Sequence, residues 1–206
     1  MSSPDFPAVI NAALDNITDD VITNNAIFNL TQYNAKDIVR QIVVLQSETV
    51  ELASAIRERD GEEYYDGLGD CLYVIGSIKQ LEPVLWSHFH AVRESLFIIR
   101  TALRGLDEAA WETVLTKAAQ IAMTNNLTKP DVTHEDAEQT QQVYANKGIA
   151  TEIVQLRDDL FIVSATETDE SKDVVAGKVL KSSSRHTKPD FSVLTQDFPI
   201  AWSEVL

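Results

Sequence analysis

The sequence lacks the features of a secreted or membrane-embedded protein. It contains a single cysteine, Cys71, so it offers neither an internal disulfide nor a cysteine-based metal site. No apolar run approaches the roughly 20 residues that a bilayer-spanning helix needs. The first residues do not combine a basic start with an apolar segment, as a signal peptide would. We therefore expect a cytoplasmic protein with no membrane partner.

Basic residues are also scarce. The chain carries 17 Lys and Arg residues against 32 Asp and Glu residues, which gives a net charge of −15 at pH 7. Such a field repels nucleic acid and anionic membranes, so we expect no nucleic-acid partner. A negatively charged substrate would need help from metal ions or from locally placed lysines. Solubility and mimicry of nucleic acid are alternative uses of the same charge.

The pattern of apolar residues predicts a mostly α fold in one domain covering residues 1–206. Apolar positions that recur every three or four residues predict helices over residues 7–19, 35–59, 62–81, 83–103, 108–123 and 133–145. Two apolar segments that flank residues 157–159 predict a small C-terminal β-hairpin. Within this helical bundle we expect a helical catalytic core over residues 35–130. The hairpin and a lysine-bearing tail would occupy residues 149–190.

Two acidic clusters lie on neighbouring predicted helices, and their members are Glu48, Glu51, Glu63, Asp66 and Asp70. Residues three or four apart share one face of a helix, so each cluster forms a carboxylate stripe. A turn at Asp60-Gly61 can fold one stripe against the other. Because like charges at close range disfavour each other, such a cluster becomes tolerable when a divalent cation lies among the carboxylates. Oxygen ligands suit Mg²⁺, with Mn²⁺ as a substitute, whereas a solvated acidic surface is the alternative.

The segments Glu48-Thr49-Val50-Glu51 and 66–75 together resemble the MazG-like, all-α NTP pyrophosphatase superfamily, which includes the phosphoribosyl-ATP pyrophosphohydrolases. This resemblance implies that carboxylates on two helices hold Mg²⁺ and that a nucleoside triphosphate is hydrolysed to the monophosphate and pyrophosphate. It implies catalytic roles for Glu48 and Glu51, which match the second and third glutamates of the E-E-x-x-E motif. Whether Glu48 is a metal ligand or the general base stays open.

The chain departs from the common family pattern at two positions. Ser47 stands at the first glutamate of E-E-x-x-E, and Gly67 stands at the glutamate of the E-L-G-D form. Glu63 and Asp66 can supply the E-x-x-D motif instead. This arrangement is similar to phage and bacterial relatives that read E-x-x-D-x-L-x-D, and it implies a phage origin and a place in the host cytoplasm.

The resemblance extends in patches to residues 125–129, 177–181 and 189–190. It implies that lysines and asparagines there contact the phosphates and sugar of a nucleotide. A leaving pyrophosphate needs positively charged hydrogen-bond donors, so further lysines are candidates for binding its phosphates. The expected phosphate-binding residues are Asn126, Lys129, Lys147, Lys178 and Lys181.

These observations predict a Mg²⁺-dependent nucleoside triphosphate pyrophosphohydrolase that controls a nucleotide pool. Because relatives pair their bundles, we expect a homodimer or homotetramer. Two alternatives remain open. One is a nucleotide-binding protein that does not cleave its ligand, which the departures at Ser47 and Gly67 favour. The other is an acidic interaction protein that mimics nucleic acid.

Overall fold

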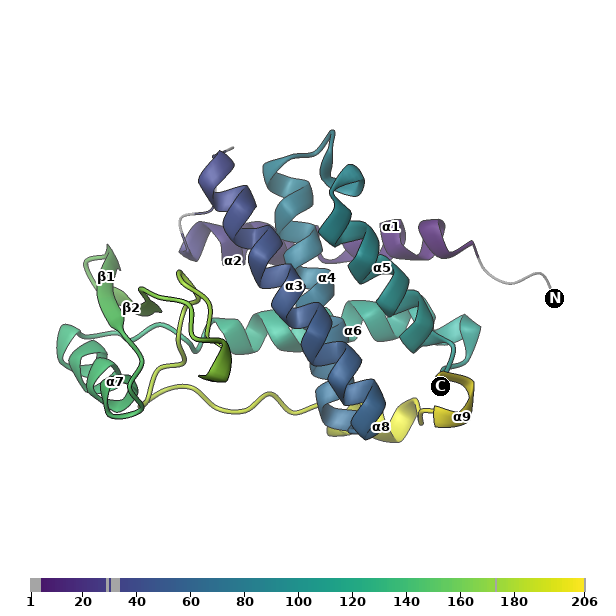
Figure 1. Ribbon diagram of the computed structural model, residues 1–206. Helices are drawn as coiled ribbons and strands as arrows, with labels where there is room; N and C mark the ends of the chain where they lie inside the picture. Colours follow the sequence, from purple (N-terminus) through teal and green to yellow (C-terminus); the bar gives the residue numbers. More distant parts are fainter. Residues whose placement is uncertain (1–4, 29, 31–33, 173, 206) are drawn as a thin grey trace. The chain divides into compact units, whose positions relative to one another are not determined.

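The computed structural model describes residues 5–28, 30, 34–172 and 174–205. The chain divides into two compact units. Unit 1 comprises residues 1–26, 30–123 and 189–206, and unit 2 comprises residues 27–29 and 124–188. The predicted fold class is confirmed, because the chain is mostly helical with a small antiparallel β-hairpin (Figure 1). The expectation of one domain stays a prediction.

Unit 1 is built from helices. Its long helices are α1 (Phe6–Asn16), α2 (Thr18–Ile27), α3 (Ala35–Glu58), α4 (Gly61–Leu81), α5 (His90–Leu103) and α6 (Trp111–Asn126), and the last residues of α2 and α6 belong to unit 2. Two short helices near the end of the chain, α8 (Ser192–Asp197) and α9 (Trp202–Val205), complete it.

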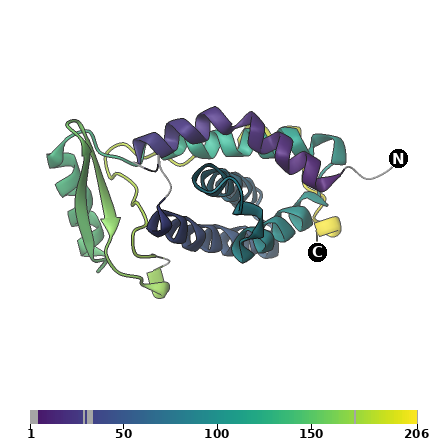
Figure 2. The same cartoon turned by 90° about the horizontal axis from the view of Figure 1, so that it is seen from above.

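Helix α4 lies in the middle of unit 1. Seen from above, it runs between α1, α2 and α6 on one side and α3 and α5 on the other (Figure 2). Glycines on α4 allow its neighbours to approach closely: a Cβ on Gly67 would lie 2.9 Å from the Leu52 Cβ of α3, and one on Gly69 would lie 2.4 Å from the Ala118 carbonyl oxygen of α6. The core of unit 1 therefore surrounds α4.

Side-chain caps begin the two helices that carry the acidic clusters. Asn34 is the N-cap of α3, and its side chain accepts a hydrogen bond from the Lys36 amide at 2.9 Å. Asp60 accepts hydrogen bonds from the amides of Glu62 and Glu63 at 3.1 and 3.2 Å, which starts α4 directly after the turn at Arg59. These caps place the acidic residues on the helices that the sequence predicts.

Two predicted helices differ from the structure. The helix predicted over residues 7–19 is two helices, because the chain breaks at Ile17 between α1 and α2. The helix predicted from Pro83 begins only at His90, after the short 3₁₀-helix η1 (Trp86–His88). Pro83 pushes the preceding residue, Glu82, out of the helical region, and the Glu82 carboxylate then accepts a hydrogen bond from the Val84 amide at 3.3 Å.

The predicted start of the next helix at residue 108 is also more irregular. Residues Glu108–Ala110 form a 3₁₀-helix, η2, capped by Asp107, and α6 then continues to Asn126. In the described part of the chain, no helix is both long enough and apolar enough to span a membrane.

Unit 2 packs α7 (His134–Asn146) against the hairpin of β1 (Thr151–Arg157) and β2 (Leu160–Ala165). The strands pair antiparallel, with Thr151 opposite Ala165 and a bulge near Gln155. Thr133 caps α7 by accepting a hydrogen bond from the Asp136 amide at 3.0 Å. A 3₁₀-helix, η3 (Glu170–Lys172), lies in the loop after β2.

Candidate functional site

The predicted carboxylates lie on α3 and α4, the closely packed helix pair of unit 1. Glu48 is buried, with 8% of its surface exposed, whereas Glu51 is exposed. On α4, Asp66 and Asp70 are half-buried, and Glu63 is exposed in the first turn of the helix. The spacing puts Glu48 and Glu51 on one face of α3, and packing then buries Glu48 and leaves Glu51 at the exposed edge of that face.

Three of the carboxylates lie close enough to the buried thiol of Cys71 to raise its pKa. Burial raises the pKa of Cys71, and the negative charges of Glu48, Asp70 and Glu51 raise it further. Burial likewise raises the pKa of Tyr73 to about 12, with a further contribution from Asp70. Glu48, Glu51 and Asp70 therefore lie within electrostatic range of one buried thiol.

The side chains of this cluster do not form a finished metal site. Within the described residues, no group of three or more His, Cys, Asp or Glu side chains is arranged to hold an ion. The donors are carboxylate oxygens, which is the chemistry that Mg²⁺ prefers. Ser47 donates a hydrogen bond to Glu51 over 3.4 Å. The magnesium site stays a prediction.

Unit 2 contains a pocket with a cavity volume of about 360 Å³. Such a volume lies within the range of small-molecule sites. Tyr144 and a few apolar side chains line it. The other lining residues are five lysines, Lys129, Lys147, Lys172, Lys178 and Lys181. Because the whole chain carries a net charge of −15, this concentration of positive charge is a local property of the pocket. We call it the lysine pocket.

Backbone hydrogen bonds hold several of these lysines in place. The Lys178 carbonyl accepts from the Ala165 amide at 3.1 Å, which fixes that residue to the end of β2. The Lys129 carbonyl accepts from the Ser182 amide at 3.0 Å, which ties the segment after α6 to the segment that carries Lys181. The lysine pocket therefore joins three stretches of unit 2 that are distant in the sequence.

Tyr144 of α7 forms one wall of the lysine pocket. Its hydroxyl accepts a hydrogen bond from the Lys181 amide at 3.1 Å and donates one to the Lys181 carbonyl at 3.3 Å. The ammonium of Lys147 lies 4.9 Å from the centroid of the Tyr144 ring, a cation–π contact. The phenol thus positions the backbone of one lysine and the side chain of another.

The pKa of His186 is affected by the positive charge of the lysine pocket. Burial lowers the pKa of His186 to about 4, and the charges of Lys181 and Lys129 contribute to this shift. Its Nδ1 lies 3.1 Å from the Thr128 hydroxyl. The imidazole is therefore neutral at pH 7, and the lysines supply the positive charge.

The four lysines predicted to bind phosphate, Lys129, Lys147, Lys178 and Lys181, do lie together. Asn126, the fifth predicted residue, is buried at the end of α6, and its carbonyl accepts a hydrogen bond from the Lys129 amide at 3.1 Å. It supports the backbone of Lys129 and is not among the described residues that line the pocket.

The sequence did not single out Lys172. Its only local signal is Asp169-x-Ser171 in the charged loop after β2, a turn pattern that holds the segment without indicating what it faces. Comparison of the chain with protein-family models, with curated proteins and with solved structures gives no match.

Proposed function

We propose that this protein binds a nucleoside triphosphate by its phosphate chain, in the lysine pocket. The observation that supports this proposal is the gathering of five lysines around one pocket in a strongly acidic chain. Positive charges gathered around one pocket attract a polyanion such as a phosphate chain. Hydrogen bonds from ammonium groups to phosphate oxygens are charge-assisted and therefore strong.

Metal-free binding tests this proposal. Isothermal titration calorimetry with ATP and with inorganic pyrophosphate in EDTA should show binding by the unchanged protein. Lys178→Met and Lys181→Met should each weaken it about tenfold, the effect of losing one hydrogen bond to a charged group. Lys36→Met, an exposed lysine of α3, is the matched control and should leave affinity unchanged. Equal affinities for all four proteins would argue against the lysine pocket.

We further propose that the carboxylates of α3 and α4 support Mg²⁺-dependent hydrolysis of the triphosphate to monophosphate and pyrophosphate. The proximity of Glu48, Glu51 and Asp70 to one buried thiol supports this assignment. When bound there, Mg²⁺ or Mn²⁺ would neutralise phosphate charge and lower the pKa of a water. Glu51 and Asp70 would then hold the ion, and Glu48 would either hold it or accept the proton of that water.

Product analysis tests the hydrolase proposal. Each NTP and dNTP is incubated with the protein and Mg²⁺ or Mn²⁺, and pyrophosphate is measured against orthophosphate. Glu51→Ala and Asp70→Ala should abolish pyrophosphate release while the protein stays folded, whereas Glu58→Ala, an exposed α3 carboxylate, should retain activity. Nucleotide binding without products would instead favour a nucleotide-binding protein. Neither binding nor products would favour an acidic mimic of nucleic acid.

The proposed activity suits control of a nucleotide pool, and the phage-type pattern of the acidic motifs supports a role in phage-infected cells. We propose a homodimer or homotetramer as the active form, since relatives with this pattern pair their bundles. The preferred base and sugar are best read from the same product assay.

A further inference from the structure

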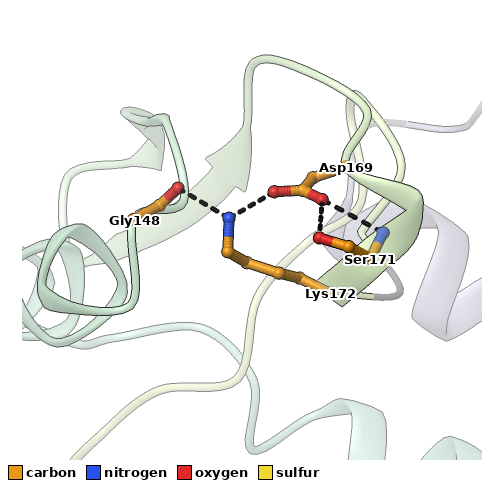
Figure 3. Close-up of polar contacts among 4 residues, drawn as sticks. All are labelled: Gly148, Asp169, Ser171 and Lys172. Atoms are coloured by element: carbon orange, nitrogen blue, oxygen red, sulfur yellow. Dashed lines mark hydrogen bonds and ion pairs between the residues drawn. The ribbon is translucent and has the colours of Figure 1, made fainter.

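One lysine of the pocket already has an anionic partner inside the protein. The Lys172 ammonium forms an ion pair with the Asp169 carboxylate and donates a hydrogen bond to the Gly148 carbonyl at 3.2 Å (Figure 3). Asp169 in turn accepts hydrogen bonds from the Ser171 amide at 3.1 Å and the Ser171 hydroxyl at 2.6 Å. The hydrogen bond from Lys172 lowers the pKa of Asp169, so this carboxylate is charged at neutral pH.

The loop that carries this pair is held by contacts that do not involve the Lys172 side chain. The Asp169 amide donates to the Val174 carbonyl at 2.8 Å, and the Val174 amide donates back to the Asp169 carbonyl at 3.1 Å. The Ala176 amide donates to the Thr168 hydroxyl at 3.1 Å. The Lys172 ammonium can therefore change partners while these backbone contacts keep the loop closed.

Gly148 provides a second anchor for the ammonium. Its φ of +70° is a conformation that glycine adopts without strain, and a Cβ at this position would lie 3.7 Å from the Lys172 Nζ. The Gly148 carbonyl, just after α7, thus accepts a hydrogen bond from the ammonium on the side opposite Asp169 in the close-up (Figure 3). An incoming anion needs to replace only the carboxylate.

We propose that Asp169 is a built-in competitor for the phosphate ligand, an inference that rests on the proposed function of the lysine pocket. A bound phosphate replaces the Asp169 carboxylate as the partner of Lys172, while the Gly148 carbonyl keeps its hydrogen bond. Because the ligand must displace an internal carboxylate, the pocket selects di- and triphosphates, with several negative charges, over singly charged anions. Lys172 is the residue that exchanges partners, and its ion pair with Asp169 determines how strongly an anion must bind to replace the carboxylate.

A double-mutant cycle with inorganic pyrophosphate in EDTA tests this inference. Asp169→Asn removes the competitor and should tighten pyrophosphate binding about two- to fivefold, and Lys172→Met should weaken it by a similar factor, the range for an exposed ion pair. In the Lys172→Met background, Asp169→Asn should bring no further tightening. Asp158→Asn, an exposed carboxylate of the hairpin turn, is the matched control and should leave affinity unchanged.

The outcomes separate this inference from the proposed function. If the unchanged protein binds pyrophosphate but Asp169→Asn weakens binding or leaves it unchanged, Asp169 is a structural residue and the inference is wrong. Tightening of equal size with and without Lys172 would mean a general charge effect and would also overturn it. If the unchanged protein does not bind pyrophosphate, the lysine pocket itself fails. Thermal unfolding of each variant confirms that the fold is retained.

Discussion

Burial and neighbouring charge give a few side chains acid–base properties far from those of the free amino acids. The thiol of Cys71 is kept protonated by burial and by the carboxylates around it, so its role is packing in the core of unit 1. His186 is kept neutral by burial and by two lysines. The pKa of Cys71 therefore reflects the carboxylates of α3 and α4, and the pKa of His186 reflects the lysines of the lysine pocket.

The pKa of His186 makes stability depend on pH. It is about 4 in the folded protein, whereas an unperturbed histidine has a pKa of about 6.5. Between these values the unfolded chain binds a proton that the folded protein does not, so the free energy of unfolding rises with pH and levels off above about pH 6.5. We expect His186→Gln to flatten this rise, as measured by urea unfolding at a series of pH values.

Two observations would contradict this expectation. One is an unchanged pH profile in the His186→Gln variant, and the other is an imidazole that titrates near pH 6.5 in NMR spectra of the folded protein. The same NMR titration gives a control on the lysine pocket. Pyrophosphate bound beside Lys129 and Lys181 should raise the pKa of His186, because it offsets the positive charge of those lysines.

At the scale of elements, helix boundaries follow local rules and helix contacts follow side-chain size. Asn34, Asp60 and Thr133 each accept hydrogen bonds from the first amides of a helix. Pro83 moves the residue before it out of the helical region, and α5 begins only at His90. The position of α4, in contrast, depends on the glycines that let α3 and α6 approach it.

This close packing predicts that Gly69→Ala destabilises the protein, whereas Gly61→Ala, on the same helix, does not. A Cβ at Gly69 would lie 2.4 Å from a backbone oxygen of α6, so Gly69→Ala should destabilise the protein by about 1–3 kcal/mol through overpacking. Gly61 is the matched control, because its Cβ would lie 3.6 Å from the nearest atom, the Cγ2 of Thr195. Urea unfolding measures both. Stabilisation by Gly69→Ala, as helix propensity alone would favour, would contradict the close contact.

At the scale of the whole molecule, charge and exposed apolar surface bear on assembly. A groove of about 860 Å³ lies between α3 and α5 in unit 1. Val50 and Phe97 line it with 66% and 68% of their surfaces exposed. Exposed apolar surface of this kind is typical of an interface, and Arg93 and Glu94 beside it offer charges of both signs. A two-fold symmetric dimer would require this surface to be complementary to itself.

We expect this groove to lie in the interface of the proposed homo-oligomer. Phe97→Asp should shift the protein toward a smaller species in sedimentation-velocity measurements, because it places a charge in an apolar contact. Val193→Asp, at an exposed apolar residue of α8, is the matched control and should not change the sedimentation coefficient. A protein that sediments as a monomer at high micromolar concentration would contradict the proposed assembly.

The sequence by itself determined the local structure and the types of chemistry available. The apolar repeats and the hairpin around residues 157–159 depend on neighbours in the chain, and the structure confirms a mostly helical chain with this hairpin. Asn34 and Thr133 cap their helices through equally local hydrogen bonds. Four of the lysines predicted to bind phosphate share one pocket, and their role in binding stays a prediction. Residue type and short-range spacing are enough for such predictions, because helix capping and strand alternation are local interactions.

Only the tertiary structure decided which residues meet. It buries Glu48 while it leaves Glu51 and Glu63 exposed, and it places Lys172 beside lysines from distant segments. The identity of these neighbours depends on how α3 packs against α4 and how the loop after β2 folds back on α7. Packing of this kind depends on side-chain size and on contacts between residues far apart in the chain, which local sequence patterns do not encode.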